Sequence, residues 1–268
     1  MPPSAGLPLF DFSLTPISDI EPWIENGRRT LHWFALSHGQ YWINAGSARI
    51  FEPREGSADP AIWQYYLARF WSDVLEMLPA ALEPIPEDIA RRLRPDRDFV
   101  RWELTANAWL KNRGEATEVA DFDLLQAALS WANERQLNTG YWIGGPKVWF
   151  ARTGETISIS WDNRSLVSDG QPLWTAEIGA FEISAEHFRR EVRDFHQRLM
   201  GAMKQRLELL VQGPRASKLL VAPEQISTEQ IMRNAALDQA FEGVKLRVPT
   251  DWAPVRCALA SLEAEFER

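Results

Sequence analysis

One stretch of the sequence has a spacing of apolar residues that only an α-helix satisfies. Its apolar side chains lie three or four positions apart, and they are Phe188, Val192, Phe195, Leu199, Met203, Leu207 and Leu210. This period places them on one side of a helix, where they can face a core. Ser184 precedes them as a candidate N-cap, and Gly213-Pro214 follows as a stop. The sequence therefore predicts a long amphipathic helix over residues 184–212.

Two other stretches alternate short aromatic and aliphatic runs with turn residues. Residues 31–52 contain three such runs and predict a three-stranded antiparallel meander. Residues 139–183 contain further runs separated by Gly and Pro, and they predict a second antiparallel sheet or an extension of the first. Five prolines in residues 2–24 exclude a helix there.

Helical spacing recurs between and after these strands. The predicted helices cover residues 61–78, ending before Pro79, and residues 96–112, 121–136, 227–241 and 253–266, with a short strand at 246–248. Ser227 to Gln230 has the form of a capping box, which places the start of the fourth helix there. We therefore expect an α+β protein whose sheets pack against several helices. The chain is expected to be one domain, 1–268, or two lobes, 1–115 and 116–268, each with one sheet.

Charge and cysteine content limit the classes of partner. The formal net charge is −8, which disfavours binding to phosphate backbones, so no nucleic-acid partner is expected. The net charge is −7 over residues 1–90 and +3 over residues 184–215, a pattern compatible with self-association or a charged partner. No apolar run approaches the ~18 residues that span a bilayer. Cys257 is the single cysteine and there is no signal-peptide pattern, so we expect a cytoplasmic protein.

Motifs that carry chemistry are not found in the sequence. The glycines at 140, 144 and 145 do not form a phosphate-binding loop, and no Ser lies in a nucleophile elbow. His187 and Glu191 have i, i+4 spacing, but two ligands do not make a metal site. Cys257 is expected to be a small buried hydrophobe. We therefore assign no catalytic residue, metal or cofactor, and favour a role without catalysis.

Two adjacent aromatic pairs, Tyr41-Trp42 and Tyr141-Trp142, lie in the predicted strands. Neighbouring residues of a strand point to opposite faces, so one member of each pair should be less buried. An outward Trp or Tyr can anchor a protein partner or a planar ligand.

Carboxylates beside aromatic residues offer an alternative function. Asp73 follows Arg69 by four positions and Asp162 follows Trp161. If Asp73, Asp162 and Glu177 met beside Trp42, Trp142 or Trp161, they could form a carbohydrate-binding or hydrolytic cleft. Otherwise Arg69 and Asp73 form an intrahelical pair, and Asp162 begins a turn. The candidate binding surface comprises Tyr41, Trp42, Arg69, Asp73, Tyr141, Trp142, Trp161 and Asp162.

Four blocks of the sequence resemble an uncharacterised bacterial family, a domain of unknown function. The blocks are LHWFALSHGQYWINAG, YYLARFWSDVLEMLPAALEPIPEDI, TGYWIGGPKVWF, and ISWDN with WTAEIGAFEISAEHFRREVRDFHQRLMGAMKQRL. The resemblance runs from about Phe12 to Leu210 and implies no known activity, cofactor or catalytic residue set. The order of strands followed by F…EV..F…M is also similar in style to small cytoplasmic immunity proteins that neutralise bacterial toxins.

These observations favour a non-enzymatic cytoplasmic protein that binds another protein, either a toxin or a second copy of itself. The alternative is a small-molecule or carbohydrate-binding protein or hydrolase that uses Asp73, Asp162 and aromatic residues.

Overall fold

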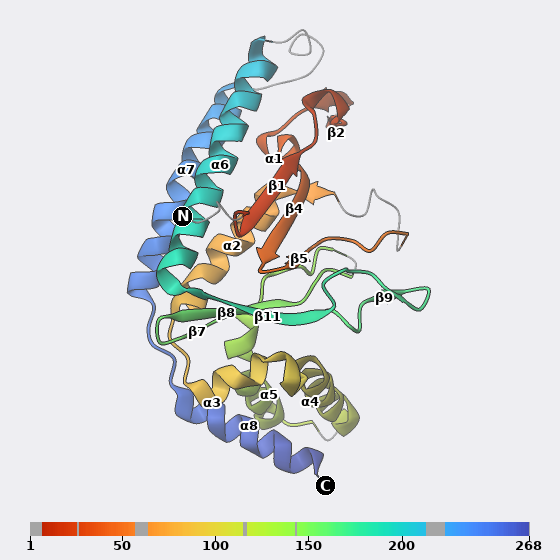
Figure 1. The fold of residues 1–268 in the computed structure, drawn as a ribbon, viewed down its shortest axis with the longest axis vertical. Coiled ribbons are helices and arrows are strands. Elements are labelled where there is room, and N and C mark those ends of the chain that lie inside the picture. The colour runs from red at the N-terminus through yellow and green to blue at the C-terminus, as the bar shows by residue number, and fades with distance from the viewer. Residues whose placement is uncertain are drawn as a thin grey trace.

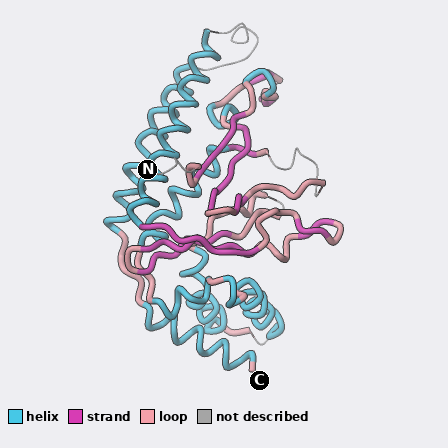
Figure 2. Tube along the Cα trace, in the orientation of Figure 1, coloured by secondary structure: helices cyan, strands magenta, loops and turns pink. Residues whose placement is uncertain are grey.

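The chain forms a mixed α+β fold in which two small antiparallel sheets lie among helices (Figures 1 and 2). The computed structural model describes residues 7–25, 27–56, 64–114, 117–142, 144–212 and 223–267. Helices α6 and α7 run side by side along one edge of the molecule, with the first sheet beside them and the second sheet crossing below (Figure 1). The expected α+β class is therefore confirmed.

The first sheet combines strands that are far apart in the sequence. Its members are β1 (Phe10–Leu14), β4 (His38–Ala45), β5 (Ala48–Ile50) and β6 (Tyr65–Tyr66). Strand β4 is central and pairs antiparallel with the other three. A Cβ on Gly39 would lie 2.2 Å from the Ser13 carbonyl oxygen, so the close approach of β1 and β4 requires glycine. The small hairpin of β2 (Trp23–Glu25) and β3 (Arg28–Thr30) precedes β4.

The prediction that residues 31–52 form three consecutive strands is wrong for the first strand. Residues Trp33–Leu36 form the single-turn helix α1, and the neighbour of β4 is instead β1. Leu31, Trp33 and Leu36 are all buried. The run is short and mostly apolar, and its spacing cannot distinguish a strand from a helical turn, which explains the error.

The second sheet confirms the antiparallel strands expected in residues 139–183. It consists of β7 (Val148–Thr153), β8 (Thr156–Asp162) and β11 (Ile178–Ser184), in the order β11-β8-β7. The short strands β9 (Val167–Ser168) and β10 (Gln171–Pro172) form a hairpin between β8 and β11.

Two helices, α2 and α6, contact the first sheet, and a third, α7, packs against both of them. They are α2 (Leu67–Leu82), α6 (Ala185–Gln212) and α7 (Pro223–Leu246). The long helix expected at 184–212 is confirmed as α6, and the Ser184 hydroxyl accepts a hydrogen bond from the His187 N–H at 3.1 Å. The helix predicted at 61–78 is wrong at both ends, because Tyr65–Tyr66 form β6 and α2 begins at Leu67 and continues past Pro79. Pro79 lies only three residues from the end of α2, where the buried Ala80, Ala81 and Leu82 hold the last turn against the core.

The predicted start of α7 at Ser227 is also wrong, because this helix begins at Pro223. Gln230 does not cap the helix. Its amide oxygen accepts from Trp33 Nε1 at 2.6 Å and its nitrogen donates to the Met200 carbonyl at 3.2 Å, both inside the core. The strand expected at 246–248 is not formed: α7 ends at Leu246, and Val248 is 83% exposed.

The remaining helices gather on the far side of the second sheet. They are α3 (Glu87–Ala90), the 3₁₀ turns η3 (Arg91–Leu93) and η4 (Pro95–Arg97), α4 (Phe99–Arg113), α5 (Val119–Asn133) and α8 (Trp252–Phe266). Helices α4, α5 and α8 correspond to those predicted at 96–112, 121–136 and 253–266. Cys257 on α8 is exposed, contrary to the expectation that it is buried.

The second sheet separates two hydrophobic clusters. Val148 and Phe150 of β7 face the first cluster, with α2, α6 and the first sheet, whereas Trp149 and Ala151 face the second, with α4, α5 and α8. Alternate residues of a strand point to opposite faces, so β7 is buried on both sides. The boundary between the expected lobes, 115–116, lies outside the described residues.

None of the helices in the described ranges combines the length and the apolar character needed to cross a membrane.

Candidate functional site

Four of the eight predicted surface residues meet in one polar cluster inside the protein. Tyr41 comes from β4, Arg69 and Asp73 come from successive turns of α2, and Tyr141 comes from the loop between α5 and β7. The hydroxyl oxygens of Tyr41 and Tyr141 lie 3.4 Å apart, and Arg69 Nε lies 3.1 Å from Asp73 Oδ1. We call these four residues the tyrosine–aspartate cluster.

Aromatic packing fixes the two tyrosine rings. The Tyr41 ring stacks on Phe70 of α2, with centroids 4.1 Å apart and planes 12° apart. The Tyr141 ring stacks on Tyr65 at 4.7 Å, and the Arg69 guanidinium lies 5.3 Å from its centroid. The hydroxyl groups therefore approach each other from rings that the core holds in place.

Burial controls the electrostatics of the tyrosine–aspartate cluster. Asp73 is 2% exposed, and both carboxylate oxygens are shielded from solvent. Burial raises the pKa of Asp73 to about 7, although the Arg69 guanidinium and the Tyr141 hydroxyl both favour the ionised form. Burial also raises the pKa of Tyr41 and of Tyr141 above the ordinary phenol value. The Asp73 carboxyl group therefore changes its protonation state near neutral pH.

Two hollows lie beside this cluster. Asp73, Glu76, Asn133, Glu134 and Arg247 are among the residues around the smaller one, which has a volume of about 230 Å³. The larger has a volume of about 560 Å³, and residues 136–140, Trp142, Lys147 and Leu166 are among those that line it. Asn133, Gln136 and Asn138 line both, so the two hollows adjoin along the segment that follows α5. The side chain of Asp73 itself is fully shielded, which separates its carboxylate from the solvent in the hollow.

The other four predicted residues have different surroundings. Trp42 points outward from β4 and is half-buried, with the Arg49 guanidinium 3.9 Å from its ring centroid. Trp142 is buried against Phe51 and Trp174. In each aromatic pair, one member is therefore buried and the other, Trp42 or Tyr141, is half-buried.

Trp161 and Asp162 lie at the end of β8. The Trp161 ring is buried against Gly179 of β11, where a Cβ would come within 2.3 Å of the ring. Asp162 accepts two hydrogen bonds from the Arg164 guanidinium, at 2.9 and 2.6 Å, and this guanidinium also donates to Asp98 at 3.0 Å. Glu177, the third carboxylate considered for a cleft, pairs with Arg54 at 2.5 Å. Asp73, Asp162 and Glu177 are thus each paired with a different arginine.

Three histidines each contact a neighbouring side chain. His187 Nε2 lies 3.0 Å from Glu191 Oε1, as their spacing predicts, while His196 is buried and accepts from Trp71 Nε1 at 3.1 Å. His38 Nδ1 lies 3.0 Å from the Thr15 hydroxyl. Within the described ranges, no three His, Cys, Asp or Glu side chains gather as metal ligands would.

Sequence reasoning did not single out Tyr65 or Arg49. Tyr65 stacks on Tyr141, and the Arg49 guanidinium lies over the Trp42 ring. These two residues were missed because each contact joins segments that only the fold brings together. The pairing of β4 with β5, through a turn at Gly46 with φ of +65°, was the one signal that could have placed Arg49 near Trp42.

The fold and this cluster define a mixed α+β protein with a buried tyrosine–aspartate–arginine network between its first sheet and α2. The chain belongs to a family of unknown function, DUF5984, which matches residues 9–258. The expected membership of an uncharacterised family is confirmed, and the match extends well beyond Leu210, into α8. No curated protein and no solved structure matches the chain.

Proposed function

We propose that this protein is a non-enzymatic cytoplasmic protein that binds another protein through the outward face of its first sheet. We define the outer sheet face by the side chains that alternate with the buried ones: Asp11, Ser13, Gln40, Trp42, Asn44 and Arg49. Strand β4 alternates strictly between half-buried and buried residues, which is typical of a sheet with one face on the core and one toward solvent. Helices α2 and α6 contact the first sheet and contribute to the core on its inner face.

The observation that carries the proposal is the position of Trp42 on this face. Across the sheet, Trp42 pairs with Asp11 of β1. On the other side, Asn44, two residues further along β4, pairs with Arg49 of β5, so Arg49 lies diagonally opposite Trp42. The Arg49 guanidinium, 3.9 Å from the centroid of the Trp42 ring, holds the indole in one orientation. A fixed, half-exposed Trp surrounded by hydrogen-bonding side chains is the kind of residue that dominates binding energy in protein interfaces.

Charge favours a cationic partner. Residues 1–90, which supply the first sheet, have a net charge of −7. A negatively charged segment attracts basic proteins and speeds their association at low ionic strength. The outer sheet face itself carries one carboxylate, Asp11, and one guanidinium, Arg49. A basic toxin that this protein neutralises fits these features, and the single, exposed Cys257 is compatible with a reducing compartment.

The hydrolase alternative has less support in the geometry. Such a mechanism needs two carboxylates that share one substrate. Asp73 is buried and ion-paired with Arg69, whereas Asp162 accepts hydrogen bonds from Nε and Nη2 of Arg164. Each carboxylate is thus ion-paired with its own arginine, and the two do not form a shared site.

The test measures binding of a purified partner. The tagged protein is used to capture partners from the native host, and the captured protein is identified, purified and titrated calorimetrically against the wild type and Trp42→Ala. We expect a basic partner whose affinity falls at least about tenfold in Trp42→Ala, equivalent to ~1.4 kcal/mol.

Trp109→Ala is the matched control, because Trp109 is also half-buried with an arginine, Arg113, 5.2 Å from its ring centroid, but lies on α4. Equal affinity of the partner for Trp42→Ala and the wild type would refute the proposal. Capture of no specific partner, or of an acidic one, would also count against it.

A further inference from the structure

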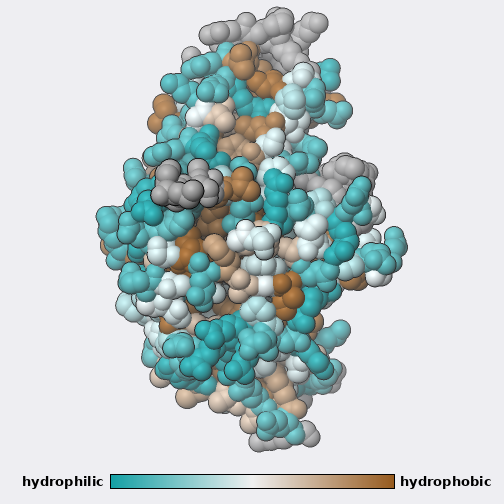
Figure 3. All heavy atoms as spheres, viewed as in Figure 1, coloured by the Kyte–Doolittle hydropathy of each residue, from teal (hydrophilic) through white to brown (hydrophobic). Residues whose placement is uncertain are grey.

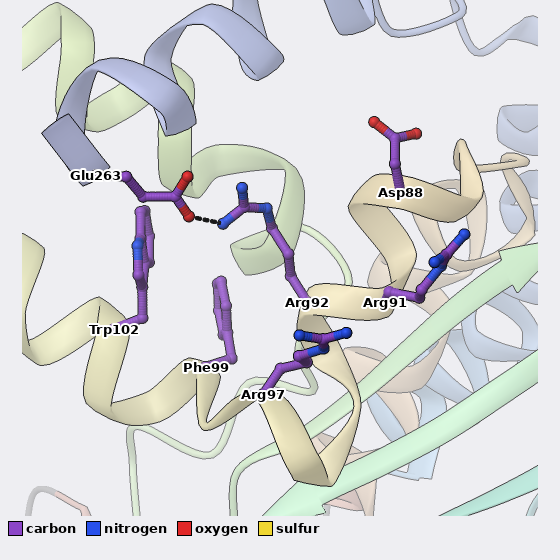
Figure 4. A pocket seen from close by; sticks show the side chains of 7 residues that line it. All are labelled: Asp88, Arg91, Arg92, Arg97, Phe99, Trp102 and Glu263. Atoms are coloured by element: carbon purple, nitrogen blue, oxygen red, sulfur yellow. Dashed lines mark hydrogen bonds and ion pairs between the residues drawn. The ribbon is translucent and has the colours of Figure 1, made fainter.

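A third hollow lies at the opposite end of the molecule from α1, among η3, η4, α4 and α8, and Figure 4 shows it from close by. Its volume is about 440 Å³, within the range of small-molecule sites. Three arginines, Arg91, Arg92 and Arg97, line it, and they belong to the segment RRLRPDRDFVR at 91–101. This segment has five Arg and two Asp, in a chain that is acidic overall.

The two carboxylates that line the hollow are already paired. Glu263 of α8 accepts from Arg92 at 2.6 Å, the interaction drawn in Figure 4. Asp88 accepts two hydrogen bonds from Arg256, at 2.7 and 3.0 Å. These pairs balance Arg92 and Asp88, so the charge left in the hollow is that of Arg91 and Arg97.

Arg91 and Arg97 are only weakly engaged. Among the residues that the structure describes, their ion pairs are with Glu87 and Asp96, close in sequence and each 3.6 Å away. The side chains of Arg91 and Arg97 are 49% and 60% exposed. Their guanidinium donors are therefore available to an anion that enters the hollow.

Two aromatic rings form the apolar part of the hollow. Phe99 and Trp102 stack with centroids 5.7 Å apart and planes 16° apart. Trp131 and Trp149 contact the Phe99 ring edge to face, which holds it in position. Trp102 Nε1 is buried and has no hydrogen-bond partner among the described residues. Because this atom is shielded from solvent, Trp102 presents ring surface rather than its N–H to a molecule in the hollow.

We infer that this hollow binds a small phosphorylated molecule that carries a planar ring, such as a nucleoside monophosphate. Two guanidinium groups favour a doubly charged phosphate, because they can donate to several of its oxygens at once. The ring surface that Phe99 and Trp102 present to the hollow favours a planar group beside the phosphate, and arginine-bound Glu263 can accept from donors on that group. This inference does not depend on the proposed protein-binding face.

The test is calorimetric titration of the full chain with AMP, adenosine and inorganic phosphate. We expect AMP to bind, and adenosine and phosphate to bind at least about tenfold more weakly. Adenosine lacks the phosphate that the arginines would bind, and inorganic phosphate lacks the planar ring. The Arg91→Gln/Arg97→Gln double variant should lose at least about tenfold in affinity for AMP. Arg101→Gln is the control, since Arg101 is exposed on α4 and does not line the hollow.

The melting temperature of each variant shows whether it folds. Undetectable AMP binding would overturn the inference, as would binding of adenosine as tightly as AMP. Equal loss in the double variant and in Arg101→Gln would show only a nonspecific effect of charge, and would also overturn it.

Discussion

Tyr41 and Tyr141 place their hydroxyl oxygens 3.4 Å apart although one hundred positions separate them in the sequence. This contact joins the first sheet to the loop that precedes the second sheet. It also encloses Asp73, whose ionisation the Tyr141 hydroxyl and Arg69 favour and burial opposes. The contact therefore couples the packing of distant segments to the charge of one carboxyl group.

Asp73→Asn tests this coupling through the pH dependence of stability. The pKa of Asp73 is about 7 in the folded protein and 3.8 as the ordinary value, so the folded state binds the proton more tightly. The wild type loses the associated stability as pH rises between these values, and Asn cannot ionise. From about pH 5 to about pH 8, we expect the variant to gain about 2 to 3 kcal/mol relative to the wild type.

Urea unfolding at both pH values measures this difference. Asp123→Asn serves as the control, because Asp123 is exposed on α5. Parallel stability profiles for Asp73→Asn and the wild type would show that Asp73 has an ordinary pKa.

Glu83→Gln should show the opposite pH dependence. Burial disfavours the Glu83 carboxylate, but hydrogen bonds from Thr250 and Arg247 and the charge of Arg135 outweigh it, so the pKa of Glu83 is lowered. The resulting stability is present above the ordinary pKa of 4.5 and is lost as pH falls through the folded-state pKa.

The Gln variant leaves the fully buried Arg135 without its charged partner 2.6 Å away. We expect a loss of about 3 kcal/mol at neutral pH that becomes smaller in acid. Chemical denaturation at about pH 7 and about pH 4 would measure it, with Glu87→Gln as the exposed control. An equal loss at both pH values would contradict the assignment.

Gly179→Ala should destabilise the second sheet. An added Cβ would lie 2.3 Å from Trp161 Cζ2, and the buried ring has little room to move. Overpacking of this kind costs about 1 to 3 kcal/mol. Gly201→Ala should instead stabilise by about 0.5 to 1 kcal/mol, because Gly201 lies within α6 with no atom near its added Cβ. Thermal unfolding should show a lower melting temperature for Gly179→Ala and a higher one for Gly201→Ala, and an unchanged or raised melting temperature for Gly179→Ala would refute the contact.

Gln230→Leu should cost about 2 to 3 kcal/mol. The change leaves Trp33 Nε1 without its acceptor at 2.6 Å and the Met200 carbonyl without its donor at 3.2 Å, both in buried positions. Gln239→Leu, at an exposed position of the same helix, controls for helix propensity. Equal free energies of unfolding for the two variants would show that the Gln230 hydrogen bonds add no net stability.

The local sequence pattern correctly predicted those elements whose intrinsic preference matches their packing in the fold. The stripe from Phe188 to Leu210 repeats at the helical period over several turns, and it forms α6 with the expected cap at Ser184. The turn at Asn112 to Gly114 ends α4, since Gly114 adopts a φ of +53° that glycine accommodates. These features depend on neighbours in the sequence, so a pattern can indicate them.

Errors occurred where distant contacts override local preference. Ser227 to Gln230 has the residues of a capping box, yet Gln230 is drawn into the core by Trp33 and Met200. Pro79 would ordinarily stop a helix, but burial of the three following residues sustains the last turn of α2.

The sequence by itself determined the mixed α+β class, the family and the period of the long helix, because these follow from local spacing and composition. It also identified Tyr41, Arg69, Asp73 and Tyr141 as candidates. Only the tertiary structure decided that these four meet, and that Asp162 pairs with Arg164 elsewhere. Side-chain proximity across one hundred residues is set by which strands and helices pack together, and no local period encodes that choice.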